Sequence, residues 1–347
     1  IRIRENAIKQ ALALDDQLGE AYASLAQIHG FRQRPDKAEA AFQKAIKLSP
    51  NYATAFHWYG HFLTNFPLRS PQALELVRKA VELDPRSKII GTMLGGAYAT
   101  QGLYSLAKRQ FQKVVELYPD FAQGYNSLTS LYAFSTGEFG KAIVTSRKSA
   151  ELDSGSVITF LFQILIYLNL DDIASAEAAR NRIEDLSAEH WALGFGDTLI
   201  AHANKNPEAM REAINWVLPK LKTMPDVAQA TAVFTLSLGD KDRSREIYLG
   251  ANPGWMFPDQ WQGLINKYAF NACVFSWVLI NTGDETLGAQ LLRQTTQYLD
   301  VDLAAVNEHV DILTPEACYL VSGDTEKALL TIETQLAHSH LFGWKVT

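Results

Sequence analysis

The sequence predicts an all-α fold, a right-handed superhelical solenoid of antiparallel helix pairs. The first observation is a leucine that recurs at intervals of 34 or 35 residues. The instances are Leu14, Leu48, Leu83, Leu117 and Leu152. Two residues after three of these leucines stands a proline, which ends a helix because it cannot donate a backbone hydrogen bond. Each leucine is therefore expected near the end of the second helix of a pair.

The first helix of each pair is predicted by a pattern of two large residues, one small residue and a further large one. Residues three, four and seven apart lie on one face of a helix, and the small residue allows a second helix to approach closely. The four instances are Tyr22, Leu25, Ala26, His29; Phe56, Tyr59, Gly60, Leu63; Gly91, Leu94, Gly95, Tyr98, in which glycine stands at the first large position; and Tyr125, Leu128, Thr129, Tyr132.

The second helices supply facing small residues seven positions apart. The pairs are Ala38 with Ala45, Ala73 with Ala80, Ala107 with Val114, and Ala142 with Ser149. Together these patterns resemble the tetratricopeptide repeat, which reads W-x2-L-G-x2-Y, then A-x3-F, then P. The resemblance covers residues 19–155, preceded by a half repeat over 1–18. Two repeats are one residue longer, and we place the extra residues in the turns 66–71 and 136–140.

The regularity of the pattern divides the chain into two parts. We expect a regular array over residues 1–155 and degenerate helix pairs over 156–347. In the latter, Ile164 replaces the small residue of the first helix. Further pairs are expected at 190–204 with 207–218 and, from recurrent Gly-Asp turns, near 226–250, 264–300 and 307–340. An insert rich in proline, glycine and aromatic residues interrupts the array at 251–263.

Composition excludes several classes of protein. The formal net charge of −6 argues against direct nucleic-acid binding, which needs concentrated Lys and Arg. The longest apolar run, 157–170, is shorter than the ~20 residues of a membrane-spanning helix, so we expect no membrane insertion. Cys273 and Cys318, the two cysteines, are interpreted as small core residues. We expect a cytoplasmic protein, with a periplasmic location still open, and a fragment of a longer chain because the helical pattern is already present at Ile1.

Local motifs give no support for catalysis. Neither a glycine-rich phosphate loop nor a compact nucleophile motif occurs, and no catalytic residue or cofactor is predicted. His57 and His61 lie four residues apart, a spacing that can present two nitrogens to a metal, but no third ligand is indicated. We therefore predict no metal site and no enzyme.

The resemblance implies a protein–protein interaction module that binds a peptide or protein. In this repeat family the first helix of each pair lines an inner groove, so the resemblance nominates specific groove residues. They are Gln27, His57, His61, Thr92, Gln123, Asn126 and Ser130. Relatives that grip a terminal carboxylate use Lys, Arg and Asn at such positions, and this chain lacks the basic members. An extended peptide or a helix is the expected ligand, bound in the groove or on the outer face.

The aromatic insert is a second candidate contact, through Trp255, Phe257 and Trp261. Clustered aromatic residues on a loop mark interaction sites, but these side chains could equally pack against the helices and seal them. An alternative function is also open. The chain could be the sensory or oligomerisation half of a bacterial transcription regulator or cyclase, which would bind a small ligand or form a homo-oligomer.

Overall fold

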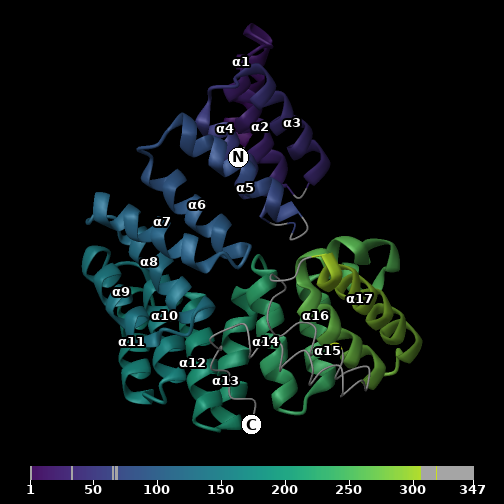
Figure 1. The fold of residues 1–347 in the computed structure, drawn as a ribbon. Helices are drawn as coiled ribbons and strands as arrows, with labels where there is room; N and C mark the ends of the chain where they lie inside the picture. Colours follow the sequence, from purple (N-terminus) through teal and green to yellow (C-terminus); the bar gives the residue numbers. More distant parts are fainter. Residues whose placement is uncertain (1, 33, 65, 67–68, 306–317, 319–347) are drawn as a thin grey trace. The chain divides into compact units, whose positions relative to one another are not determined.

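The computed structural model describes residues 2–305 apart from 33, 65 and 67–68, together with Cys318. Over these residues the chain forms the α-helices α1 to α17 with short π and 3-10 segments and no β-strand. The all-α prediction is therefore confirmed. The helices belong to two compact units, unit 1 over residues 1–120 and unit 2 over 121–347 (Figure 1). The expected change of regularity at residue 155 falls inside unit 2.

Unit 1 consists of one leading helix and three hairpins. The leading helix is α1 (Arg2–Leu14). The hairpins are α2 (Gly19–Phe31) with α3 (Pro35–Leu48), α4 (Ala53–Leu63) with α5 (Ser70–Leu83), and α6 (Lys88–Thr100) with α7 (Tyr104–Leu117). Each recurring leucine of this unit is the last residue of its helix, as the sequence predicts.

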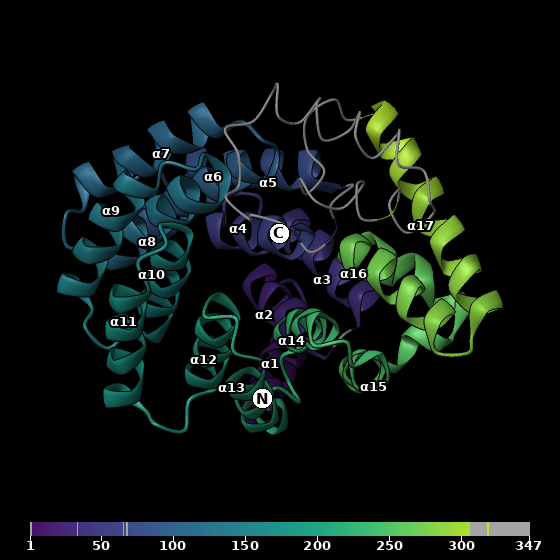
Figure 2. The same ribbon diagram turned by 90° about the horizontal axis from the view of Figure 1, so that it is seen from below.

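Unit 2 continues with hairpins that are also consecutive in the chain. They are α8 (Ala122–Ser130) with α9 (Phe139–Leu152), α10 (Val157–Asn169) with α11 (Ile173–Leu186), α12 (Trp191–Ala203) with α13 (Pro207–Val217), α14 (Pro225–Ser237) with α15 (Lys241–Ala251), and α16 (Trp261–Asn281) with α17 (Glu285–Ala305). In Figure 2 the first helices α10 and α12 lie on the inner side of their partners α11 and α13.

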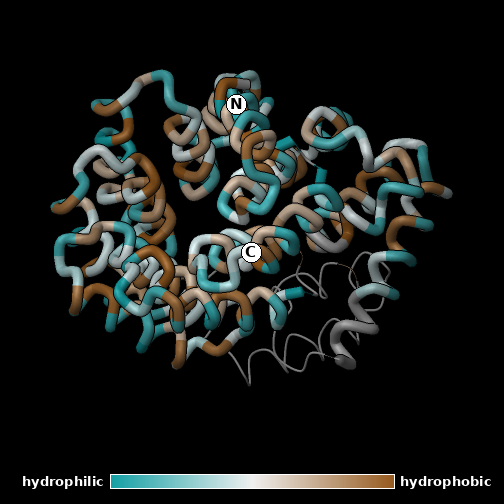
Figure 3. The backbone as a smooth tube through the Cα atoms, turned by 90° about the horizontal axis from the view of Figure 1, so that it is seen from above, coloured by the Kyte–Doolittle hydropathy of each residue, from teal (hydrophilic) through white to brown (hydrophobic). Residues whose placement is uncertain are grey.

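Close packing inside the hairpins depends on the small residues of the first helices. A Cβ atom on Gly60 would lie 2.6 Å from Cγ2 of Val77, and one on Gly95 would lie 2.5 Å from Cδ1 of Phe111. Such distances are shorter than van der Waals contact, so a larger residue would force the helices apart. Apolar and polar residues alternate along much of the backbone (Figure 3), and a helix with this pattern has one face for such packing.

The extra residue of the fourth repeat lies elsewhere than predicted. Directly after α8 the chain forms a π-helical segment, Leu131–Ser135. The backbone N–H of Thr136 donates to the carbonyl of Leu131 at 3.0 Å, a spacing of five residues. A π-turn holds one residue more than an α-turn. The insertion is therefore absorbed at the end of the first helix, before the turn 136–140.

Several predicted turns of unit 2 are confirmed by their capping contacts. Asn206 Oδ1 accepts from the backbone N–H of Ala209 at 3.1 Å, and Asp240 Oδ1 accepts from that of Arg243 at 3.0 Å. Gly239 has a φ of +80°, the left-handed conformation that glycine adopts most readily. The helix pair expected near 307–340 lies outside the described residues apart from Cys318.

The two cysteines are a correction to the sequence analysis. Cys273 and Cys318 form a disulfide, with their Cα atoms 4.9 Å apart, across 45 residues of sequence. Both are fully buried, so the expectation of core positions is right, but their interpretation as simple small core residues missed the disulfide. Sequence spacing gives no information on this distance in space. Among the described residues no helix has the length and apolarity needed to cross a membrane.

Candidate functional site

The predicted groove residues of unit 1 lie on its first helices α2, α4 and α6. Helix α2 contacts α4, and α4 contacts α6, so these helices form a continuous layer. Gln27, His57 and Thr92 are partly exposed and His61 is exposed. The hydroxyl of Thr92 donates to the backbone carbonyl of Lys88 at 2.8 Å, which fixes its rotamer. We call the surface formed by Gln27, His57, His61 and Thr92 the first-helix face.

The two histidines of this face differ in environment. Burial lowers the pKa of His57, and the nearby imidazole of His61 lowers it further. A neutral imidazole both donates and accepts hydrogen bonds, so His57 is suited to contact backbone amides or neutral side chains. Over the described residues no group of three His, Cys, Asp or Glu side chains could hold a metal ion.

Apolar side chains adjoin the first-helix face. Trp58 follows His57 on α4 and is partly exposed, and Ile89 in the first turn of α6 is 49% exposed. Trp58 was not among the groove residues expected from the sequence, although its position next to His57 was an available signal. Indole and aliphatic surface beside imidazole and amide groups can bind a polypeptide through both apolar contact and hydrogen bonds.

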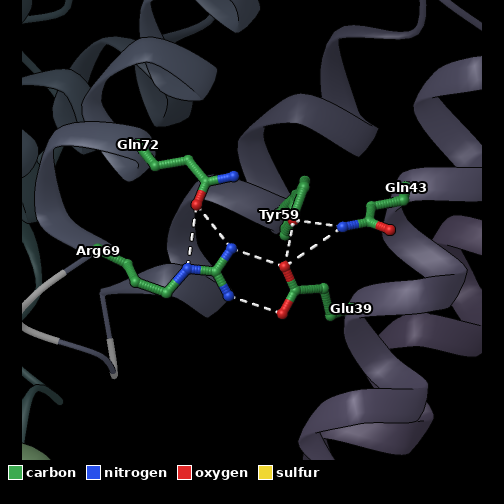
Figure 4. A network of polar contacts seen from close by, with 5 residues as sticks. All are labelled: Glu39, Gln43, Tyr59, Arg69 and Gln72. Carbon is green, nitrogen blue, oxygen red and sulfur yellow. Dashed lines mark hydrogen bonds and ion pairs between the residues drawn. The ribbon is translucent and has the colours of Figure 1, made fainter.

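A polar network connects three helices of unit 1 next to this face (Figure 4). The carboxylate of Glu39 accepts two hydrogen bonds from the guanidinium of Arg69, each 2.6 Å, and one from the hydroxyl of Tyr59 at 2.8 Å. Gln72 Oε1 accepts two more bonds from Arg69, and Gln43 lies 3.5 Å from the Tyr59 hydroxyl. Because Arg69 donates to it, the pKa of Glu39 is held below its usual value. Charge-assisted bidentate pairs of this kind have a defined geometry. This pair therefore holds α3, α4 and the start of α5 in a fixed arrangement.

A hollow of about 700 Å³ lies beside the first-helix face, between α1, α2 and α4. On α1 it is lined by Arg4, Ala7, Ile8 and Ala11. Gln27 and Trp58 also line it, so the hollow and the first-helix face overlap at Gln27. The half repeat that forms α1 was expected from the sequence, whereas the hollow beside it was not.

The predicted groove residues of unit 2 are less uniform. Gln123 is exposed and Ser130 partly exposed, whereas Asn126 is only 8% exposed. The Oδ1 atom of Asn126 accepts a hydrogen bond from the hydroxyl of Thr159 at 3.1 Å. Asn126 therefore contributes to the contact between α8 and α10, and its carbonyl oxygen is already engaged.

The aromatic insert corrects part of the second prediction. Trp255 and Trp261 are fully buried, and Phe257 is 50% exposed. Trp261 Nε1 donates to the backbone carbonyl of Trp255 at 2.8 Å, and both indoles belong to the apolar core of unit 2. The two tryptophans are therefore core residues, stabilised because their large apolar surface is removed from water. Of the three aromatic residues, only Phe257 is available for a surface contact.

Comparison with known proteins identifies the repeat. The tetratricopeptide repeat family matches residues 19–52 and 92–121, which hold the α2–α3 hairpin and α7 with most of α6. The chain carries tetratricopeptide repeats. Both matched segments lie within the regular array predicted from the sequence. No curated protein matches the sequence.

Several solved structures match parts of the chain at low sequence identity. The Cut9–Hcn1 hetero-tetramer of APC/C has a TM-score of 0.51 at 15% identity, covering 95% of this chain and 58% of that chain; at this identity the likeness concerns the fold alone. PilW, a type IV pilus biogenesis factor, is 22% identical over 55% of this chain and 88% of its own, with a TM-score of 0.49. YrrB, a tetratricopeptide-repeat protein with an unusual peptide-binding site, is 20% identical over 57% of this chain and 98% of its own, with a TM-score of 0.40.

Proposed function

We propose that unit 1 binds a polypeptide along its first-helix face. The tetratricopeptide-repeat fold is an interaction scaffold. Our choice of the first-helix face as the ligand-binding surface rests on one observation. Helices α2, α4 and α6 form a contiguous layer whose predicted groove side chains all remain at least partly exposed. The second helices, in contrast, bury their small residues against these first helices.

The chemistry of the first-helix face favours a ligand without a dominant charge. Its members are one amide, two imidazoles and one hydroxyl, and burial keeps His57 neutral at pH 7 by lowering its pKa. No lysine or arginine belongs to this face. An extended peptide or a helix with apolar anchors next to Trp58 and Ile89 fits this surface, because such ligands gain affinity from buried apolar area and directed hydrogen bonds.

A selected peptide tests this proposal. Peptides are selected from a displayed library against the whole chain, and the Kd of one binder is measured by calorimetry for the wild type and variants. His57→Ala and Gln27→Ala should each weaken binding about three- to tenfold, the effect of losing one hydrogen bond. Lys79→Ala, a control on the exposed side of α5, should leave the Kd unchanged. Equal affinities of all four proteins would refute the first-helix face as the binding surface.

The disulfide bears on the compartment. Structural disulfides persist in oxidising compartments, so the pairing of Cys273 with Cys318 favours the periplasmic location over the cytoplasmic one. To test this, cells are denatured directly in a thiol-alkylating reagent. A reduced pair reacts once unfolding exposes it, whereas a disulfide-bonded pair stays unlabelled. The alternative functions, a regulator half or a small-ligand sensor, stay predictions.

A further inference from the structure

Two positions at which α3 meets α4 carry polar residues, although the same positions in the next repeat are apolar. Glu39 on α3 has the repeat position of Leu74 on α5, 35 residues later. Tyr59 on α4 has that of Leu94 on α6, and the two leucines lie in one buried apolar cluster. The carboxylate of Glu39 instead accepts one hydrogen bond from the Tyr59 hydroxyl and two from Arg69 (Figure 4). Hydrogen bonds therefore stand where the next repeat has an apolar contact.

Stability alone does not explain this polar contact. The side chains of Glu39 and Arg69 are 25% and 32% exposed, so water screens their attraction. Exchanging both partners of an ion pair for apolar residues is often neutral or stabilising, although removing one partner alone is costly. The polar contact adds direction, because hydrogen bonds weaken steeply when they are misaligned and apolar contacts have no preferred direction.

Tyr59 controls the rotation of α4 about the helix axis. It lies two residues after His57 and two before His61, and each residue turns an α-helix by about 100°. The two histidines therefore share one side of α4, and Tyr59 projects from the opposite side. The burial agrees with this, since Tyr59 is 2% exposed and His61 is exposed. A fixed Tyr59 hydroxyl thus fixes the direction in which both histidines point.

Small rotations of α4 would disturb a bound ligand. Side-chain tips lie about 5–6 Å from the axis of an α-helix, so a rotation of about 20° would move them by about 2 Å. Hydrogen bonds tolerate only about 0.5 Å of change in length. The stacking of the Tyr59 ring on Phe42, with centroids 5.3 Å apart, is apolar and less directional. The hydrogen bonds to Glu39 therefore decide the rotation.

We propose that Glu39, Tyr59 and Arg69 are positioning residues that hold α4 at the rotation in which its two histidines meet a bound polypeptide. The inference rests on the proposed function, because it takes the first-helix face as the binding surface. It deepens that function by assigning residues that act on the affinity without touching the ligand.

Two variants at Tyr59 test the proposal. In the first, Glu39→Leu and Tyr59→Leu together reproduce the apolar contact of the next repeat, so the urea midpoint should equal or exceed that of the wild type. In the second, Tyr59→Phe keeps the ring against Phe42 and removes only the hydroxyl. We expect the Kd of the library-selected peptide to rise at least about tenfold in the double variant and about three- to tenfold in Tyr59→Phe.

Two further variants separate geometry from charge. Arg69→Lys keeps the positive charge but cannot donate two parallel hydrogen bonds to Glu39, so it should weaken peptide binding about three- to tenfold as well. Glu75→Leu removes an exposed ion pair of α5 and should leave the Kd unchanged. This control has the same change of residue type as Glu39→Leu but lies outside the network.

The pKa of His57 reports the rotation of α4 without any ligand. Burial lowers this pKa, and the nearby imidazole of His61 lowers it further. Once α4 can turn, we expect the average burial of His57 to fall. NMR titration should then give a pKa closer to 6.5 in the double variant than in the wild type. The His57 resonance is identified by its loss from the His57→Ala protein.

The outcomes separate positioning from a purely structural role and from the proposed function. Weaker binding in the double variant at an unchanged or higher urea midpoint, with a raised His57 pKa, supports the inference. An unchanged Kd and pKa, or a loss of binding that follows a fall of the midpoint in every variant, overturns it. If His57→Ala and Gln27→Ala leave the Kd unchanged, the proposed function fails. The His57 pKa then decides alone, and an unchanged value overturns the positioning role as well.

Discussion

Two adjacent glycines of α6 predict opposite effects of the same substitution. A Cβ atom on Gly95 would lie 2.5 Å from Cδ1 and 2.9 Å from Cζ of Phe111, whereas one on Gly96 would have no neighbour within 4 Å. Phe111 is only 4% exposed and is enclosed between α6 and α7, so its ring cannot move aside freely. Gly95→Ala should therefore destabilise unit 1, and Gly96→Ala should stabilise it.

The magnitudes follow from two opposing effects. Replacing glycine by alanine inside a helix stabilises the fold by up to about 1 kcal/mol through the lower entropy of the unfolded chain. At Gly96 nothing opposes this gain. At Gly95 overpacking against the ring costs about 1–3 kcal/mol, which exceeds the gain in most of that range. The free energies of unfolding of the two variants should thus differ by about 1–3 kcal/mol.

Urea unfolding followed by circular dichroism measures this difference. Both variants are compared with the wild type under one buffer condition, and the midpoints should rank Gly96→Ala above wild type above Gly95→Ala. A Gly95→Ala protein as stable as Gly96→Ala would mean that α6 and α7 are not in the close contact described here.

Three further predictions concern pH and redox state. The pKa of Glu39 is lowered by its hydrogen bonds with Arg69, so the stability that its carboxylate contributes is present above pH 4.5 and is lost as the pH falls below that value. Glu39→Gln should lower the free energy of unfolding at pH 7 by about 1–2 kcal/mol. The variant's stability should also depend less on pH below 4.5 than that of the wild type. Burial lowers the pKa of His57 from 6.5, so protonation favours the unfolded chain as the pH falls below 6.5, and His57→Gln should remove that part of the pH dependence in melting curves between pH 7 and 5. Reduction of the Cys273–Cys318 disulfide opens a loop of 45 residues, and the thermal midpoint with reductant should fall by the equivalent of about 4 kcal/mol; an unchanged midpoint would show that the bond does not form.

Local sequence patterns predicted the regular helices well because each pattern has a local physical cause. The leucines before proline mark the ends of α3, α5 and α7, since proline stops a helix wherever it occurs. The Gly-Asp turn at Gly239 was predictable for the same reason, because both residue types act on the backbone next to them.

Features that depend on distant parts of the chain were missed. The disulfide joins residues 45 positions apart, and no local pattern reports that distance. Asn126 has the repeat position of a groove residue, yet Thr159 from the next first helix reaches its side chain. The hollow between α1, α2 and α4 was also missed, and the available signal was Arg4, an arginine where the other second helices of unit 1 carry alanine.

Photo-crosslinking of a bound peptide tests the central claim most directly. A benzophenone amino acid is placed at His61 on the first-helix face or at Lys79 on the exposed side of α5, and each protein is irradiated with the library-selected peptide. The account predicts a covalent adduct from position 61, suppressed by excess unlabelled peptide, and none from position 79. An adduct formed at position 79 and absent at position 61 would contradict it.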